Sequence, residues 1–377
     1  MKQEQLVWHW YAGLKQVTLW EKEQLLAGGL SPEELFACPS RAAAEELLER
    51  AGCHRKADGW ERLLAAVLGE AEKERAEQEL ELFSEKGIKI AARSSAEYPK
   101  RLRHISLPPL CLYYYGMLPE EEAPAIAIVG ARNCSTYGEE LAACFAAGLA
   151  EAGVQIISGL ARGVDASAGR AAINRTGRAY AVMGCGVDIC YPKENKRLYE
   201  QHREKGGILS EELPQSAPLA YRFPKRNRLI SALSDGVLVV EAAEKSGSLI
   251  TAEYALEQGK DIYAVPGRCC DRLSMGCNRL IQAGARLVCE PEEILLALPG
   301  HFFTDHNKRT KEFFLETNEK KVYACLSLHP KHIEELARET ALALPELVCV
   351  LFQMEMKHYI RQTGKNYYIK NLTNSSE

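Results

Sequence analysis

The sequence predicts an α/β fold in which a parallel sheet is flanked by a helical region before it and a small helix-and-hairpin region after it. Two observations predict this. Short apolar runs alternate with helical segments through the middle of the chain, as they do where parallel strands are buried on both faces. Near the end, three helical stretches precede two short strands. The 377 residues suit two or three domains.

These patterns divide the chain into three regions and a connection. The first region, 1–85, is helical: Ser31 followed by Pro32 predicts a capped helix start, and 65–85 predicts one charged helix. We assign 1–85 to a helical, SAM-like N-terminal domain and 86–298 to an extended Rossmann-like core with a parallel sheet. Residues 299–316 form a polar linker, and 317–377 form a winged-helix domain.

The elements of the core and of the C-terminal region follow from periodicity. Near-continuous apolar runs predict strands at 125–129, 154–158, 179–183, 236–241 and 261–265, with helices at 138–152 and 248–258. In the last region, helices are expected at 318–328, 332–340 and 345–357, followed by a hairpin at 359–362 and 367–369. Three helices before a hairpin are typical of a winged helix.

Composition restricts the functions that the chain can have. The net charge of −4 excludes a uniformly basic nucleic-acid-binding surface, so a polyanion site must be a local basic patch. The 13 cysteines contain no C-x-x-C pair, which argues against a zinc site. The N-terminus lacks the pattern of a signal peptide, and no uncharged apolar run is long enough to cross a bilayer. We therefore expect a cytoplasmic protein with reduced thiols, no membrane association and no metal.

The loops that follow the predicted strands carry small and basic residues, and ligands bind at such carboxyl ends in open parallel sheets. In 130–138, Arg132 and Ser135 are candidate phosphate ligands. In 158–165, Gly159 and Arg162 repeat this combination, and Asp165 is expected to cap the next helix. After the third strand, Lys193 is a further candidate, and Asn195 is expected to cap a helix.

The strongest candidate segment is 223–234, together with the two residues that precede it. Four cations, two aromatic residues and an amide lie close together around its start: Tyr221, Arg222, Phe223, Lys225, Arg226, Asn227 and Arg228. Cations that follow phosphates, beside rings that stack on bases, suit single-stranded nucleic acid. The two arginines at 226 and 228 do not easily point the same way on a helix. One of them can instead pair with an acid such as Glu241 inside the domain.

Ser246, Gly247 and Ser248 precede a predicted helix and offer backbone N–H groups to an anion, although an ordinary helix cap explains the same residues. No histidine lies in any of these loops, and neither an H-E-x-x-H motif nor a paired-carboxylate motif occurs. Cations and small residues without a catalytic base indicate binding more than turnover.

The motifs, taken in order, resemble the DNA-processing protein A (DprA/Smf) family. They are G-A-R-x-x-S-x-Y-G at 130–138, S-G-L-A-R-G-V-D at 158–165, G-x-G with Y-P-x-x-N at 184–195, S-E-x-x-P at 210–214, F-P-x-R-N-R-L-I-S-A-L-S at 223–234, V-V-E-A with S-G-S-L-I-T-A at 239–252, and Y-A-V-P-G at 263–267. The resemblance covers most of 95–290. The chain departs from the family at Gly169, at Asp235 and at 269–273.

The resemblance implies a function. Members of this family bind incoming single-stranded DNA during natural transformation, protect it, and load the recombinase RecA onto it while displacing single-strand-binding protein. They act as homodimers joined through the core, with no catalytic turnover and no cofactor. Arg132 and the basic residues around F-P-x-R-N-R match the DNA pocket of the family.

We therefore expect a sequence-tolerant site for single-stranded DNA. Phosphates would be held by Arg132, Lys225 and Arg226 and by the amides of Gly159 and Gly247, with Phe223 against a base or sugar. Two alternatives are a Rossmann-like enzyme that processes nucleotide phosphates and a scaffolding module with a vestigial pocket. The P-G-G-x-G-T-x-x-E motif of one such enzyme class, the nucleotide phosphoribohydrolases, is absent from the sequence.

Overall fold

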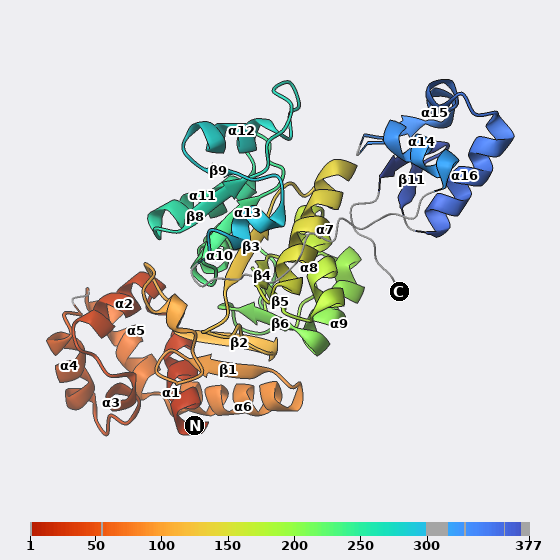
Figure 1. Cartoon of the computed structure of the whole chain (residues 1–377). Coiled ribbons are helices and arrows are strands. Elements are labelled where there is room, and N and C mark those ends of the chain that lie inside the picture. Colours follow the sequence, from red (N-terminus) through yellow and green to blue (C-terminus); the bar gives the residue numbers. More distant parts are fainter. Residues whose placement is uncertain (1, 54–55, 299–315, 328, 358, 371–377) are drawn as a thin grey trace. The chain divides into compact units, whose positions relative to one another are not determined.

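A computed structural model describes residues 2–53, 56–298, 316–327, 329–357 and 359–370 (Figure 1). The predicted linker 299–316 lies outside the described residues, apart from Glu316. One nine-stranded sheet has the order β1-β2-β6-β5-β4-β3-β7-β8-β9, and a three-stranded sheet has the order β10-β12-β11. A mostly parallel sheet with helices, a helical N-terminal region and a small antiparallel C-terminal sheet confirm the predicted fold class.

The chain divides into two compact units. Unit 1 comprises 1–123 and 180–233, and unit 2 comprises 124–179 and 234–377. Both units therefore take residues from the predicted core domain 86–298, whose limits remain a prediction.

Unit 1 begins with six helices: α1 (Lys2–Gly13), α2 (Leu19–Ala27), α3 (Pro32–Phe36), α4 (Arg41–Arg50), α5 (Ala57–Leu68) and α6 (Glu70–Glu85). The predicted start at Ser31 is confirmed, because its side chain accepts a hydrogen bond from the N–H of Glu34. The single helix predicted over 65–85 is wrong. The chain leaves the helical conformation at Gly69, with φ −71° and ψ 114°, and a Cβ there would lie 2.7 Å from the carbonyl oxygen of Ala65.

The other elements of unit 1 are β1 (Lys89–Ala92), η1 (Lys100–Leu102), β2 (Cys111–Gly116), β5 (Ala179–Val182), η2 (Lys193–Asn195), α9 (Lys196–Lys205), β6 (Gly207–Ser210) and α10 (Arg222–Ala232). Strand β2 pairs antiparallel with both β1 and β6, whereas β5 and β6 are parallel. Strands β1, β2 and β6 were not predicted. The basic segment 222–232 is helical, which decides the directions in which its cations point.

Unit 2 holds the parallel strands β3 (Ala125–Val129), β4 (Gln155–Ser158), β7 (Gly236–Val239), β8 (Asp261–Ala264) and β9 (Arg286–Leu287). Its helices are α7 (Thr136–Glu151), α8 (Val164–Arg175), α11 (Gly247–Glu257), α12 (Met275–Gln282) and α13 (Pro291–Leu295), with α7 and α8 packed side by side (Figure 1). The five predicted strands and the two predicted core helices are confirmed, with their ends shifted by at most two residues. Strand β9 was not predicted.

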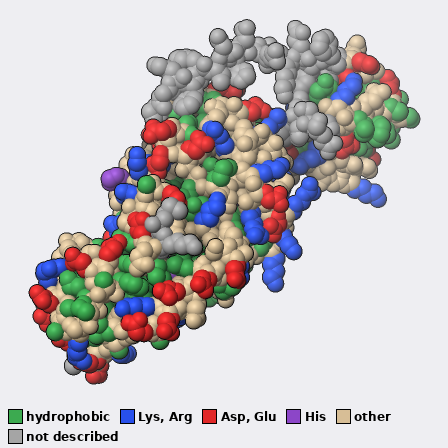
Figure 2. Space-filling view, turned by 90° about the horizontal axis from the view of Figure 1, so that it is seen from below, with side chains coloured by type: hydrophobic (Ala, Val, Ile, Leu, Met, Phe, Trp, Pro, Cys, Tyr) green, Lys and Arg blue, Asp and Glu red, His purple; other side chains and the backbone are tan. Residues whose placement is uncertain are grey.

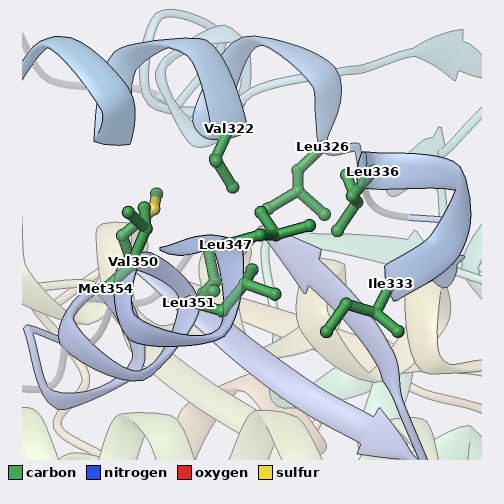
Figure 3. Packing of buried hydrophobic residues seen from close by; sticks show 9 residues of the cluster. Val322, Leu326, Ile333, Leu336, Leu347, Val350, Leu351 and Met354 are labelled. Atoms are coloured by element: carbon green, nitrogen blue, oxygen red, sulfur yellow. The ribbon is translucent and has the colours of Figure 1, made fainter. Parts of the chain in front are cut away.

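The C-terminal region has the winged-helix arrangement that the sequence predicts. It comprises α14 (Thr317–Cys325), β10 (Lys331–His332), α15 (Ile333–Thr340), α16 (Leu344–Met356), β11 (Ile360–Gly364) and β12 (Tyr367–Lys370). Apolar side chains from its three helices converge in one core (Figure 3). Among them, Leu336, Leu347 and Met354 are 0% exposed. Strand β10, only two residues long, was not predicted.

Two properties of the described residues limit the classes of function. None of the helices within them is both long and apolar enough to cross a bilayer. Nor do they gather three or more His, Cys, Asp or Glu side chains in a way that could hold a metal ion. All thirteen cysteines are present as free thiols.

A buried lysine lies among the N-terminal helices. Lys22 is 5% exposed, and its ammonium group donates a hydrogen bond of 2.7 Å to the carbonyl oxygen of Ala12. Burial lowers the pKa of Lys22 to about 8, because the charged form loses its hydration. The N-terminal helices therefore enclose a charge that is retained at neutral pH.

We expect the free energy of unfolding of the wild-type chain, relative to that of a Lys22→Met variant, to increase between pH 7.5 and pH 9.5. Below pH 8 the lysine is protonated in both folded and unfolded chains, and its burial is destabilising. Above pH 8 the folded chain releases the proton while the unfolded chain keeps it, so this cost falls, by up to about 1.4 kcal/mol per pH unit. Urea unfolding at both pH values measures the difference. The exposed Lys15, changed to Met, is the control, and an equal difference at both pH values would contradict the prediction.

Candidate nucleic-acid interface

Three neighbouring strands of unit 2 end at the same edge of the sheet. Strands β4, β3 and β7 are adjacent and parallel, so the loops after them lie together. The loop after β3 contacts both neighbours: the N–H of Ala131 donates to the carbonyl oxygen of Glu241 at 2.7 Å, and the N–H of Val164 donates to that of Ala131 at 3.3 Å. The structure thus brings together the predicted loops 130–138 and 158–165, which we call the arginine loops.

Glycines permit the close approach of the two arginine loops. Gly163 has φ 72°, and a Cβ there would lie 2.3 Å from the carbonyl oxygen of Ala131. A Cβ at Gly130 would lie 2.6 Å from the side chain of Val164. The side chains of Arg132 and Arg162 are exposed on these loops. Two exposed guanidinium groups on touching loops suit a phosphate backbone.

A buried carboxylate fixes the first arginine loop. Glu241 is 5% exposed and accepts hydrogen bonds from the N–H of Ser135 at 2.8 Å and from its hydroxyl at 2.5 Å. Gly138 leaves room for this carboxylate, because a Cβ there would lie 2.4 Å from Oε2 of Glu241. The hydroxyl predicted to bind phosphate, that of Ser135, is therefore used inside the protein, where it also caps α7.

The second arginine loop is held by Asp165, and two expectations need correction here. Gly163, not Asp165, is the N-cap of α8. The carboxylate of Asp165 instead accepts hydrogen bonds from the N–H groups of Gly159 at 3.0 Å and Ala161 at 3.4 Å. The amide of Gly159, expected to bind phosphate, is thus directed to an internal carboxylate.

The interpretation of Ser246 as an ordinary helix cap is confirmed. Its side chain accepts a hydrogen bond from the N–H of Ser248 at the start of α11, and the two hydroxyl oxygens lie 2.8 Å apart. Ser248 is buried and Gly247 is exposed, with no atom within 4 Å of the position that a Cβ would take. Anion binding by these three residues remains a prediction.

Two of the cations on α10 point into unit 1. Arg226 and Arg228 are each 5% exposed. Nη2 of Arg228 lies 2.5 Å from Oε2 of Glu211, whose side chain is also buried, and Arg226 donates to the carbonyl oxygen of Val182. The expectation that one arginine pairs with an internal acid is correct, but the acid is Glu211 and not Glu241. Asn227 accepts a hydrogen bond of 3.2 Å from Nε of Arg226, and is partly buried.

The remaining cations of this segment also have acidic neighbours. Arg222 forms an ion pair with Glu212 at 3.0 Å, and Lys225, whose side chain is 40% exposed, lies 3.6 Å from Glu211. Burial raises the pKa of the Glu212 carboxyl group. Both acids follow β6, in the S-E-x-x-P motif, to which the sequence analysis had assigned no role. Lys225 is therefore the cation of this segment most exposed to solvent.

Phe223, two residues before Lys225 in sequence, is one member of an aromatic pair. The ring of Phe223 covers Gly184, where a Cβ would lie 2.9 Å from Cδ1 of the ring. The rings of Tyr191 and Phe223 are 5.3 Å apart and tilted by 35°, and we call them the aromatic pair. Tyr191 is 39% exposed and was not predicted as a site residue, although it belongs to the Y-P-x-x-N motif. Lys193, two residues further, is exposed, and Asn195 occupies the N-cap position of α9, where its side chain does not cap the helix.

Charges of both signs are interspersed on the face drawn in Figure 2. This distribution agrees with the net charge of −4, which limits basic surface to local patches. The exposed cations named above can therefore bind a polyanion only as small local groups.

Comparison with known proteins identifies relatives of both the core and the C-terminal region. The sequence model of DNA recombination-mediator protein A matches residues 89–299, and that of the DprA winged helix domain matches 308–364. DNA processing protein DprA of Streptococcus pneumoniae is 44% identical over 198 residues, which cover 52% of this chain and 70% of that protein. Protein Smf of Escherichia coli is 39% identical over 280 residues, covering 72% and 74% respectively.

Solved structures give the same result. The X-ray structure of DNA processing protein A from Streptococcus pneumoniae has a TM-score of 0.60 and 34% identity, covering 76% of this chain and 99% of that one. DNA processing protein A from Helicobacter pylori, whose structure was described for its single-stranded DNA binding mode, has a TM-score of 0.50 and 28% identity. The match covers 55% of this chain and 95% of the Helicobacter pylori chain.

We expect Glu211→Gln to lower the free energy of unfolding by about 3–5 kcal/mol, because it leaves the buried guanidinium of Arg228 without its carboxylate. The double change Glu211→Leu with Arg228→Met should recover most of this loss, since apolar side chains of similar size replace both charges. Urea unfolding measures both.

Glu151→Gln is the matched control. It removes an exposed carboxylate 3.0 Å from Arg175, and should change stability by about 1 kcal/mol or less. An equal effect of Glu211→Gln and Glu151→Gln would contradict the structural role given to the buried pair.

Proposed function

Because the chain belongs to the DprA/Smf family of DNA recombination-mediator proteins, we propose that it binds single-stranded DNA, protects it and loads a RecA-type recombinase onto it. The observation that carries this proposal is the pair of exposed arginines, Arg132 and Arg162, on touching loops at the carboxyl edge of three parallel strands. The relative from Helicobacter pylori was described for binding single-stranded DNA, and we extend that activity to this chain.

Phosphate recognition is assigned to the exposed cations. Arg132 and Arg162 can each present a planar fork of donors to phosphate oxygens, and Lys193 and Lys225 can act as point charges. Gly247 can add a backbone N–H at the start of α11. These groups read phosphate and no base edge, so binding would tolerate any sequence.

The buried members of the predicted set have a positioning role in this proposal. Arg226 and Arg228 hold α10 against the end of β5 and against Glu211, and Ser135, Gly159 and Ser248 fix loop conformations through internal hydrogen bonds. Asn227 supports Arg226. They would affect DNA binding only through the residues that they position.

Base contacts are assigned to the aromatic pair of Tyr191 and Phe223. A ring can stack on any base, which adds affinity without sequence preference. The exposed Tyr221, 67% exposed, offers a further ring one turn before Lys225. Rings beside cations distinguish a single strand, whose bases are open, from a duplex, whose bases are stacked.

The remaining parts of the proposal concern partners and place of action. We propose that the chain acts in the cytoplasm as a homodimer joined through its core, displaces single-strand-binding protein, and serves natural transformation or related DNA processing. A dimer would double the number of sites along one strand and raise avidity. We propose no catalytic step and no cofactor. The alternative of a nucleotide-processing enzyme would be favoured by release of free base from nucleoside monophosphates.

We expect the double variant Arg132→Ala, Arg162→Ala to bind single-stranded oligonucleotides more weakly and with a smaller salt dependence. Each phosphate neutralised on a single strand contributes about −0.7 to the slope of log affinity against log salt concentration, so the slope should fall in magnitude by about 1.4. Fluorescence anisotropy across a salt series measures it. Arg175→Ala, at the far end of α8, is the control, and an unchanged slope in the double variant would refute the assignment.

Phe223→Leu should weaken binding by about 1–3 kcal/mol while leaving the salt slope unchanged, because it removes a stacking ring and no charge. Leucine keeps apolar volume over Gly184, so the fold is preserved. Trp20→Ala, which removes an aromatic side chain that is 60% exposed in the N-terminal helical region, is the control. Equal affinities of wild type and Phe223→Leu would exclude stacking on this ring.

A further inference from the structure

Two cysteines stand side by side on the surface of unit 2. Cys269 and Cys270 are the only adjacent cysteines in the chain, and both are exposed. Apart from Cys289 and Cys349, the other thiols are wholly or partly buried. Burial raises the pKa of the Cys277 thiol, for example, to about 12, which keeps it protonated and unreactive. An oxidant in solution can therefore reach two thiols together at the adjacent pair.

The adjacent pair lies at the centre of a tight turn. The N–H of Asp271 donates a hydrogen bond of 3.1 Å to the carbonyl oxygen of Arg268. Cys269 and Cys270 are therefore the two central residues of a β-turn. All residues from 268 to 272 are exposed, so no neighbouring side chain encloses the tip of this turn. We call 268–272 the cysteine turn.

The base of the cysteine turn is fixed at the edge of the sheet that carries the arginine loops. Strand β8 is parallel to β7, which in turn neighbours β3, so the segments after these strands lie along one edge. The N–H of Ala242, the residue after Glu241, donates to the carbonyl oxygen of Leu273 at 2.7 Å. The side-chain amide of Asn278 exchanges hydrogen bonds of 3.2 and 3.0 Å with the backbone of Gly267. The turn thus projects from an anchored base.

A disulfide cannot close at the centre of this turn without changing the backbone. Adjacent Cα atoms lie about 3.8 Å apart across a trans peptide, whereas Cα atoms joined by a disulfide ordinarily lie about 4.4–6.8 Å apart. A bond between Cys269 and Cys270 is therefore strained, and strained or exposed disulfides are the ones that are readily reduced. Because the base is anchored and the tip is exposed, the change falls on the tip, which carries Arg268 and Arg272.

We propose that Cys269 and Cys270 form a reversible dithiol–disulfide site, and that closing the disulfide weakens the binding of single-stranded DNA. In the reduced turn, Arg268 and Arg272 are exposed cations beside the proposed phosphate site and can contact the same strand. Closure displaces them, so a phosphate contact is lost. The oxidation stands on the thiols alone, whereas its effect on affinity rests on the proposed DNA binding.

A small disulfide such as oxidised glutathione is the oxidant. One cysteine thiolate attacks a sulfur of oxidised glutathione, forms a mixed disulfide and releases one glutathione thiolate. The neighbouring thiolate then attacks the protein sulfur of the mixed disulfide, which forms the bond between Cys269 and Cys270 and releases the second glutathione. Two electrons pass to oxidised glutathione, and the two protons of the cysteines end on the two glutathione thiols.

Peptide mass spectrometry of the full chain after incubation in glutathione buffers tests the oxidation. Wild type and Cys289→Ser should both give a peptide with a bond between Cys269 and Cys270, lighter by two hydrogen atoms, and excess reduced glutathione should reverse it. Cys289→Ser is the matched control because it removes another exposed thiol of unit 2. A bond from either cysteine to Cys289, or no bond between the pair at any glutathione ratio, would overturn the site.

Fluorescence anisotropy with a single-stranded oligonucleotide tests the effect on DNA. Each phosphate contact contributes about −0.7 to the salt slope, so at about 0.15 M salt the oxidised wild type should bind about fourfold more weakly than the reduced protein. The double variant Cys269→Ser, Cys270→Ser should bind equally under both conditions. Equal binding by oxidised and reduced wild type would refute this effect alone. Absence of binding by reduced wild type would refute the proposed function and the effect together.

Thermodynamic linkage gives an independent check on the same effect. An oligonucleotide that binds the reduced form about fourfold more tightly must favour reduction by the same factor. Saturating oligonucleotide should therefore raise the reduction potential of the pair by about 18 mV, at about 29.6 mV per tenfold change. An unchanged potential alongside weaker binding would place the loss of affinity at another thiol and overturn the coupling.

Discussion

The buried carboxylate of Glu241 is the interaction on which the proposed phosphate site depends. A charge with 5% exposure is costly unless hydrogen bonds compensate it, and Ser135 supplies two through its N–H and its hydroxyl. Ser135 is also the N-cap of α7. Glu241, which follows β7, therefore fixes both the loop after β3 and the helix that begins at the end of that loop. Since Arg132 belongs to that loop, its position is set before any ligand arrives. A loop held in this way loses little freedom on binding, which preserves affinity.

In unit 1 the buried charge is a cation, and a carboxylate compensates it. Arg228 is buried and its charge is met by Glu211, while Lys225, further out on the same helix, lies near the other oxygen of that carboxylate. Glu211 and Glu212, the two acids after β6, therefore pair with cations of α10 that hold the helix in place. Lys225 remains exposed to solvent. This division explains how a strongly basic segment exists in a chain whose net charge is −4.

The sequence could predict the elements whose patterns are local. Strands β3, β4, β5, β7 and β8 are apolar runs that end near glycine or an acid, and they were found. Strand β6 directly follows a charged helix, and β1 carries an exposed lysine at its start, so neither has a distinctive pattern. The break at Gly69 depends on the carbonyl of Ala65, which no periodicity reveals.

The site, too, could be predicted only where its pattern is local in the sequence. The loops were found because ligands bind at the carboxyl ends of parallel strands. Which of their polar groups remain available depends on distant partners: Glu241 is 106 residues from Ser135, and Glu211 is 17 residues from Arg228. These pairs occupy polar groups of Ser135 and Arg228, and no local pattern in the sequence reveals the partner.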